Sequence, residues 1–204
     1  MSRINQRRRT VISAALACAL TPSLLWASQR EETLADNVAS TMRRSVNNVS
    51  PARLVFSTPQ AGRQWLYEMS ARLAKFIPDA RERETILINV QYEAKRAGLD
   101  VQLILGLIEV ESMFRRYAIS GVGARGLMQV MPFWVRHIGT SGHNLFEIRT
   151  NLRYGCTILR YYIDRERGDI TRALARYNGS LGRMTYPNKI YAAMRRNWIY
   201  NGAV

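Results

Sequence analysis

Apolar residues recur at intervals of three and four along most of this chain, the spacing that predicts amphipathic helices. In residues 61–77, for example, Trp65, Met69 and Leu73 fall on one face, and Pro78 ends the helix. The same reasoning predicts further helices over residues 31–44, 79–98, 101–113, 151–167, 170–177 and 188–198, with a helical turn after Pro132. Because nearly every predicted element is a helix, we expect an all-α fold.

The first 27 residues have the composition of a signal peptide. Four arginines and no acid precede an apolar run over residues 11–20, and Ala27 offers a small residue at a plausible cleavage point. The run is shorter than the roughly 20 apolar residues that a membrane helix needs, so we expect cleavage rather than a retained membrane anchor. We therefore predict an exported, periplasmic protein.

Composition divides the rest of the chain into three parts. Residues 28–60 are polar and contain turn-forming pairs such as Asn47-Asn48, which predicts a linker or loosely ordered segment around the helix expected near its start. Residues 61–97 are predicted to form two N-terminal helices. Residues 98–200 contain the remaining predicted helices, with glycine-rich loops between them.

The chain is strongly basic, with a formal net charge of +15. Loss of the predicted leader lowers this charge only to +11, so the basic character belongs to the folded part. Such a surface can bind nucleic acid, contact an anionic wall or membrane, or simply be solvated. No nucleic-acid-binding motif accompanies the charge, and the export signal conflicts with that partner. We expect no nucleic acid, and favour peripheral contact with an anionic wall or membrane.

Several catalytic chemistries lack the side chains they need. The only histidines are His137 and His143, and they form no cluster with metal-ligand spacing and no Ser-His-Asp arrangement. Once the leader is removed, Cys156 is the only cysteine. We therefore expect no metal and no cofactor.

Residues 101–114 (VQLILGLIEVESMF) are apolar around the whole circumference of a helix, which predicts a buried helix. Glu109 and Glu111 lie near its end, about 160° apart, so they face opposite directions. A buried carboxyl either pairs with a cation or has a raised pKa, and a raised pKa suits general-acid catalysis. Pairing with Arg115 or Arg116, or emergence into solvent, would account for the same residues, so periodicity alone does not choose between these interpretations.

Four motifs in a fixed order distinguish between these interpretations of Glu109 and Glu111. They are Glu111-Ser112, residues 118–132 (AISGVGARGLMQVMP), residues 175–179 (ARYNG), and Tyr186-Pro187 followed by Tyr191. From Gly98 to Trp198 the sequence resembles the catalytic domain of the soluble-type lytic transglycosylases (SLT domain), which is similar in fold to goose-type lysozyme. The resemblance implies that residues 98–200 form a lysozyme-like helical catalytic domain with glycine-rich active-site loops.

The resemblance also implies a reaction. Glu111 would protonate the glycosidic oxygen between N-acetylmuramic acid and N-acetylglucosamine in peptidoglycan. It would then accept the proton of the muramic acid C6 hydroxyl, which attacks C1 and closes a 1,6-anhydro ring. This chemistry needs no second catalytic carboxylate, unlike the usual glycosidase mechanism.

The same resemblance assigns residues to the substrate. Ser120 and Gln129 would contact the sugar, and Met131 would line the cleft. Tyr177 and Asn178 would help position Glu111 and the substrate, and Tyr191 would approach the acid from the last helix.

Three departures from the family pattern concern the sugar contacts. Gly179-Ser180 replaces the usual Ala-Gly after Asn178, Arg115-Arg116 replaces the usual Asn-Pro, and Ile158 stands where a tyrosine is usual.

Two other functions remain open at this stage. A hydrolytic muramidase would use water on the same fold, and a non-catalytic peptidoglycan-binding protein could serve assembly within cell-envelope machinery.

Overall fold

The computed structural model describes residues 29–47 and 50–202, so the predicted signal peptide lies outside the described residues. Every regular element in these ranges is a helix, which confirms the predicted all-α fold. The elements are α1 (Asp36–Val46), α2 (Pro59–Leu73), α3 (Ala80–Arg96), α4 (Val101–Ser112), α5 (Phe133–Ile138), α6 (Ile148–Arg165), α7 (Ile170–Tyr177), α8 (Thr185–Ala193) and the π-helical turn η1 (Met194–Trp198).

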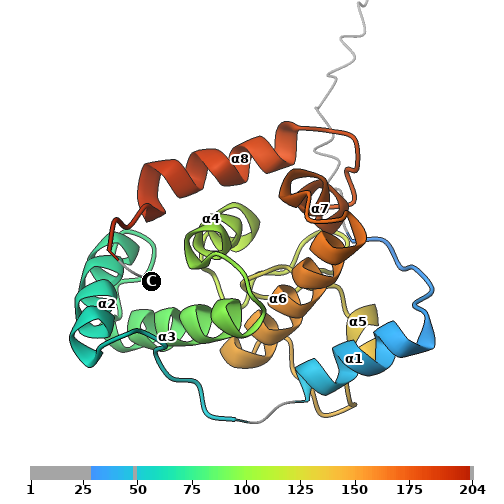
Figure 1. Cartoon of the computed structure of the whole chain (residues 1–204), viewed down its shortest axis with the longest axis horizontal. Coiled ribbons are helices and arrows are strands. Elements are labelled where there is room, and N and C mark those ends of the chain that lie inside the picture. Colours follow the sequence, from blue (N-terminus) through green and yellow to red (C-terminus); the bar gives the residue numbers. More distant parts are fainter. Residues whose placement is uncertain (1–28, 48–49, 203–204) are drawn as a thin grey trace, which may run out of the picture.

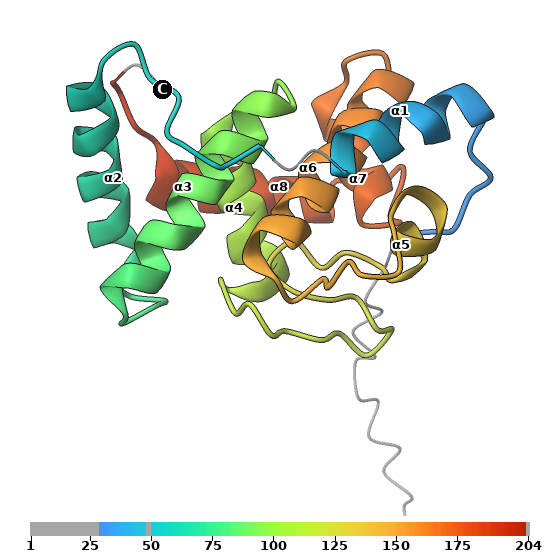
Figure 2. The ribbon, with the colours of Figure 1, turned by 90° about the horizontal axis from the view of Figure 1, so that it is seen from below.

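Helix α4 lies at the centre of the molecule (Figure 1). It packs against α3, α8 and η1, and its apolar residues are buried on all sides, as its composition predicted. Gly106 permits the closest of these contacts, because a Cβ there would lie 3.0 Å from the carbonyl oxygen of Ile190 in α8. Figure 2 shows α6 and α7 beside this centre, with α1 and α5 at the far end.

The predicted helix starts are largely confirmed by their caps. The Asp79 carboxylate accepts a hydrogen bond from the backbone N–H of Arg81 (2.7 Å), and Asp100 accepts one from Gln102 (2.7 Å). The last helix was predicted to start near residue 188, and this was wrong: α8 begins at Thr185. Pro187 therefore lies in its first turn, where a missing N–H costs no helical hydrogen bond.

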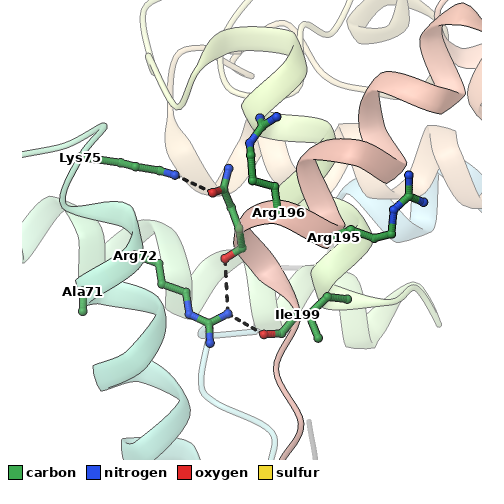
Figure 3. Close-up of a pocket in the computed structure, with 7 residues that line it drawn as sticks. Ala71, Arg72, Lys75, Arg195, Arg196 and Ile199 are labelled. Carbon is green, nitrogen blue, oxygen red and sulfur yellow. Dashed lines mark hydrogen bonds between the residues drawn. The ribbon is translucent and has the colours of Figure 1, made fainter.

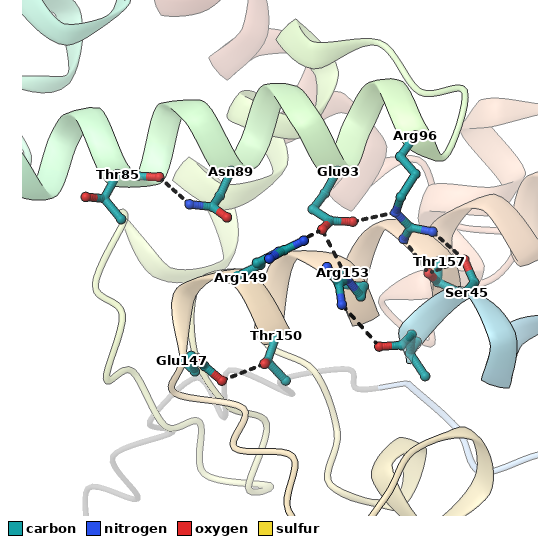
Figure 4. A network of polar contacts seen from close by, with 11 residues as sticks. Ser45, Thr85, Asn89, Glu93, Arg96, Glu147, Arg149, Thr150, Arg153 and Thr157 are labelled. Atoms are coloured by element: carbon teal, nitrogen blue, oxygen red, sulfur yellow. Dashed lines mark hydrogen bonds and ion pairs between the residues drawn. The ribbon is translucent and has the colours of Figure 1, made fainter. Parts of the chain in front are cut away.

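A buried ionic cluster joins α1, α3 and α6 (Figure 4). The fully buried Glu93 carboxylate accepts hydrogen bonds from Arg96 Nε (2.6 Å) and Arg153 Nε (3.1 Å), and Arg149 Nε lies 3.7 Å away. Arg96 also donates to Ser45 Oγ in α1 (2.6 Å). A buried charge is tolerated only when it is paired in this way, so the cluster fixes how these three helices meet.

The segment before α1 is held against the domain by its two glutamates. Glu31 lies 2.6 Å from His137 Nε2 in α5, and Glu32 lies 2.5 Å from Arg165 Nη1 in α6 and 3.4 Å from Arg176 Nη1 in α7. The helix that follows runs from Asp36 to Val46, somewhat later than the predicted range of 31–44. Within the described part of the chain, no helix is long and apolar enough to cross a membrane.

We predict that Glu93→Gln lowers the free energy of unfolding by about 3 kcal/mol, because it leaves the buried Arg153 guanidinium and the partly buried Arg96 and Arg149 without their counter-charge. Urea denaturation measures this change. Glu84→Gln, an exposed position on the same helix, is the control and should change the free energy by less than about 0.5 kcal/mol. Equal effects of the two substitutions would contradict the role given to the cluster.

Candidate active site

Glu109 and Glu111 face opposite sides of α4, as their spacing predicted. The Glu109 carboxylate accepts hydrogen bonds from Arg196 Nη2 (2.7 Å), Asn197 Nδ2 (2.8 and 3.0 Å) and Trp198 Nε1 (2.8 Å). Every one of these donors comes from the C-terminal turn η1. Glu109 therefore anchors the C-terminal turn to the central helix.

Glu111 lies in very different surroundings. Its carboxylate accepts a hydrogen bond from the Tyr186 hydroxyl in α8. No ion pair with Arg115 or Arg116 forms: Arg115 Nε donates to the Ser112 carbonyl (3.1 Å), and the Arg116 guanidinium lies over the Tyr117 ring. Burial raises the pKa of Glu111 to about 7, although the Tyr186 hydrogen bond opposes the shift. Glu111 can thus both donate and accept a proton near neutral pH.

The glycine-rich loop beside Glu111 is shaped by two of the predicted site residues. Ser120 closes its first turn, since Ser120 Oγ accepts a hydrogen bond from the Ala124 N–H (3.0 Å). Gln129 Nε2 donates to the carbonyls of Ala118 (3.2 Å) and Gly126 (2.9 Å). Gln129 also has a φ of 47°, a left-handed conformation that few residues adopt. Both side chains therefore stabilise the loop.

Residues 126–130 are buried but belong to no helix, so side chains satisfy those backbone groups that the loop itself leaves unpaired. Ser112 Oγ donates to the Leu127 carbonyl (2.8 Å), and the Tyr177 hydroxyl donates to the Met128 carbonyl (2.8 Å). Asn151 Oδ1 accepts from the Met128 N–H (2.8 Å), while its Nδ2 donates to the Arg125 carbonyl (2.8 Å). These contacts bring the first, second and third sequence motifs together.

Gly126 is required where this loop passes Asn151. Its φ is +74°, which disfavours other residues, and a Cβ would lie 2.3 Å from Asn151 Nδ2. A larger residue would push away the amide that holds the loop.

The structure places the other predicted site residues as follows. Tyr177 is fully buried, which raises the pKa of its phenol, and the nearby Glu111 carboxylate raises it further. Asn178 ends α7 directly after it. Met131 is partly buried after the loop and packs against the core.

Tyr191 does not make the contact expected of it. Its hydroxyl forms a hydrogen bond with Thr171 Oγ1 (2.9 Å), and the hydroxyl that reaches Glu111 is that of Tyr186. The reason is the earlier start of α8, which makes Tyr186 part of the helix packed against α4. Tyr186 belonged to the fourth motif but had been given no role.

Gln29 is a second residue that sequence reasoning missed. Its side chain is only 5% exposed, and its Oε1 accepts hydrogen bonds from Trp134 Nε1 (2.8 Å) and the Met131 N–H (3.3 Å). The N-terminal segment thus supports the end of the active-site loop. No local pattern signals a contact between residues about a hundred positions apart. Among the described residues, no group of three or more histidine, cysteine or acidic side chains could hold a metal ion.

The fold and the site together define an all-α domain built around one acid with a raised pKa. Residues 88–198 match the model of the transglycosylase SLT domain family, more than half of the chain. The chain therefore belongs to the transglycosylase SLT domain family.

Several known proteins are similar over part of their length. The transglycosylase of Enterobacteria phage PRD1 is 34% identical over 100 residues, which is 46% of this chain and 37% of that protein. Membrane-bound lytic murein transglycosylase C of Actinobacillus pleuropneumoniae serotype 5b (strain L20) is 35% identical over 123 residues, 55% of this chain and 32% of that protein. The chain thus spans about a third of the length of these relatives. Among solved structures, an inactive mutant of lytic transglycosylase Slt from Pseudomonas aeruginosa aligns with 78% of this chain and 32% of its own, at 24% identity and a TM-score of 0.44.

We predict that the raised pKa of Glu111 makes stability depend on pH. Between the ordinary value of 4.5 and about 7, the folded chain keeps a proton that the unfolded chain has lost. This contribution is complete below about pH 4.5 and is lost as the pH rises through 7. From about pH 5 to about pH 8, the free energy of unfolding of the parent should therefore fall by about 2 kcal/mol relative to that of Glu111→Gln, as measured by urea denaturation. If the free energy of unfolding depended on pH in the same way in both proteins, that result would contradict the raised pKa of Glu111.

Proposed function

We propose that this chain is an exported lytic transglycosylase that cleaves the β-1,4 bond between N-acetylmuramic acid and N-acetylglucosamine in peptidoglycan, leaving 1,6-anhydro-N-acetylmuramic acid. Glu111 is the single general acid and base. The substrate class rests on family membership and on the names of the similar proteins, which are a transglycosylase and lytic murein transglycosylases. The export rests on the predicted leader in residues 1–27.

The observation that carries the proposal is the isolation of the Glu111 carboxyl. Only burial and the Tyr186 hydrogen bond shift its pKa, and no second carboxylate contributes. A two-carboxylate glycosidase places its acids close together, where like charges raise one of the two pKa values. Its neighbour Glu109 faces away and is saturated by donors from the C-terminal turn. This isolation supports a mechanism in which one acid serves both halves of the reaction.

The steps follow from this arrangement. Neutral Glu111 donates its proton to the glycosidic oxygen as the bond from that oxygen to C1 breaks. The carboxylate that results is stabilised by the Tyr186 hydroxyl. It then takes the proton of the C6 hydroxyl, whose oxygen bonds to C1, and Glu111 returns to its neutral form. No water is consumed. Ser120, Gln129, Met131, Tyr177 and Asn178 are the residues that we assign to the substrate.

Residues 98–200 would form the catalytic domain, with residues 61–97 as helices that support it. Partners in the cell-envelope machinery would determine where the wall is opened.

Mass spectrometry of the soluble products from purified sacculi tests the reaction directly. We expect anhydro-muropeptides from the parent and none from Glu111→Gln. Reducing muropeptides from the parent would instead establish a hydrolytic muramidase on the same fold. Binding to sacculi by both proteins, without products from either, would identify a non-catalytic binding protein.

The pH dependence of the rate tests the role of Tyr186. Because Glu111 must start protonated, we expect kcat to fall as the pH rises through about 7. Tyr186→Phe removes the hydrogen bond that lowers this pKa, so the falling limb should move to higher pH. Tyr191→Phe is the matched control, because that hydroxyl bonds Thr171, and it should leave the limb in place. Equal shifts in the two variants would overturn the assignment.

A further inference from the structure

A pocket with a volume of about 460 Å³ lies between the end of α2 and the C-terminal turn η1 (Figure 3). It is lined by Ala71, Arg72, Lys75, Arg195, Arg196, Asn197 and Ile199. Four of these seven side chains are cationic, and only two are apolar. The pocket is therefore unsuited to an apolar ligand and suited to an anion.

The positive charge of this pocket is only partly balanced. Arg196 pairs with Glu109 (2.7 Å), and Arg72 lies 3.6 Å from Glu68. Lys75 and Arg195 have no carboxylate within ion-pair distance among the described residues. Glu109 adds little net repulsion, because the Arg196 guanidinium balances its charge. Two positive charges remain in excess.

Neutral groups hold two of these cations in place. Arg72 Nη1 donates to the backbone carbonyls of Ile199 (2.5 Å) and Asn197 (3.3 Å), and Lys75 Nζ donates to Asn197 Oδ1 (2.6 Å). Figure 3 shows these bonds as dashed lines. A carbonyl oxygen orients a cation without cancelling its charge, so the donors are arranged in advance and their potential is preserved.

We propose that this pocket binds a phosphate group. Lysine and arginine side chains reach it from two segments about 120 residues apart. A phosphate offers several oxygens to donors from different directions, whereas a carboxylate offers two. Arg196 and Asn197 of the pocket contact Glu109, on the side of α4 opposite Glu111, so a phosphate bound there lies away from the Glu111 carboxyl. The phosphate can belong to an anionic phospholipid headgroup or be a free ion. This proposal does not depend on the proposed catalytic function.

The test uses the full chain and two double variants of equal charge. Lys75→Gln with Arg195→Gln removes the two pocket cations that lack a carboxylate partner. Arg63→Gln with Arg81→Gln removes two exposed cations elsewhere, on α2 and α3, and is the matched control. Because all three proteins carry the same residues 1–28, any contribution of that segment to binding is common to them.

Inorganic phosphate is added first, at constant ionic strength, and followed by NMR. We expect it to shift the Asn197 side-chain amide and the Ile199 backbone amide. The pocket variant loses the charge-assisted hydrogen bonds of two cations, so it should bind at least about tenfold more weakly, and the control should stay within about twofold of the parent. Absence of these shifts, or equal weakening in both variants, would overturn the proposal.

Sedimentation with vesicles then identifies the source of the phosphate. If phosphatidylglycerol vesicles bind the parent and the control more tightly than the pocket variant, and phosphatidylcholine vesicles do not, the site holds a lipid headgroup. If all three proteins bind both vesicles alike while phosphate still shifts the two amides, the ligand is a small free phosphate. Both results support a phosphate site.

Discussion

The structure depends on one constraint: residues 126–130 are buried between helices yet form no helix themselves. Its polar groups must find partners, because a buried unpaired N–H or carbonyl is costly. Ser112, Asn151 and Tyr177 provide them, from α4, α6 and α7 respectively. The same bonds that satisfy the loop therefore set its position beside the acid. This explains why serine follows the glutamate: Ser112 ties the end of the acid's own helix to the glycine-rich loop.

The two glutamates of α4 show that surroundings, rather than position along a helix, decide what a carboxyl group does. Glu109 is met by donors from three consecutive residues, so its charge is satisfied and it serves as an anchor. Glu111 accepts a hydrogen bond from the Tyr186 hydroxyl, and burial has the larger effect on its pKa. Desolvation favours the neutral acid, while the hydroxyl favours the carboxylate. Their balance near pH 7 gives a group that can change its protonation state during a reaction.

The sequence predicted well those features that depend on neighbouring residues. Helix periodicity, the aspartate caps and the opposite directions of Glu109 and Glu111 are local, and the structure confirms them. The tyrosine that contacts Glu111 is Tyr186 and not the Tyr191 that the sequence predicted. This contact links α4 and α8, so it depends on where α8 begins, which the sequence pattern did not locate correctly. The support from Gln29 spans more than a hundred residues, and no pattern marks it. The grouping of the motifs around the loop was implied by a family resemblance and by no spacing rule.

In the mechanism that we propose, a single acid serves two successive proton transfers and must stay within reach of two different oxygens, so it must be held firmly. The end of α4 meets this need. After Ser112 the chain turns through two left-handed residues, Met113 and Phe114, at a cost of about 1–2 kcal/mol each. The turn buries the Phe114 ring against Phe76 and Trp198, with ring centroids 5.3 and 5.2 Å apart. Trp198 in turn donates to Glu109. The helix that carries Glu111 is thus fixed by the turn at Met113 and Phe114, by the packing of the Phe114 ring, and by the contacts of Glu109 with η1. These contacts more than compensate for the cost of the left-handed turn, so the strained turn persists.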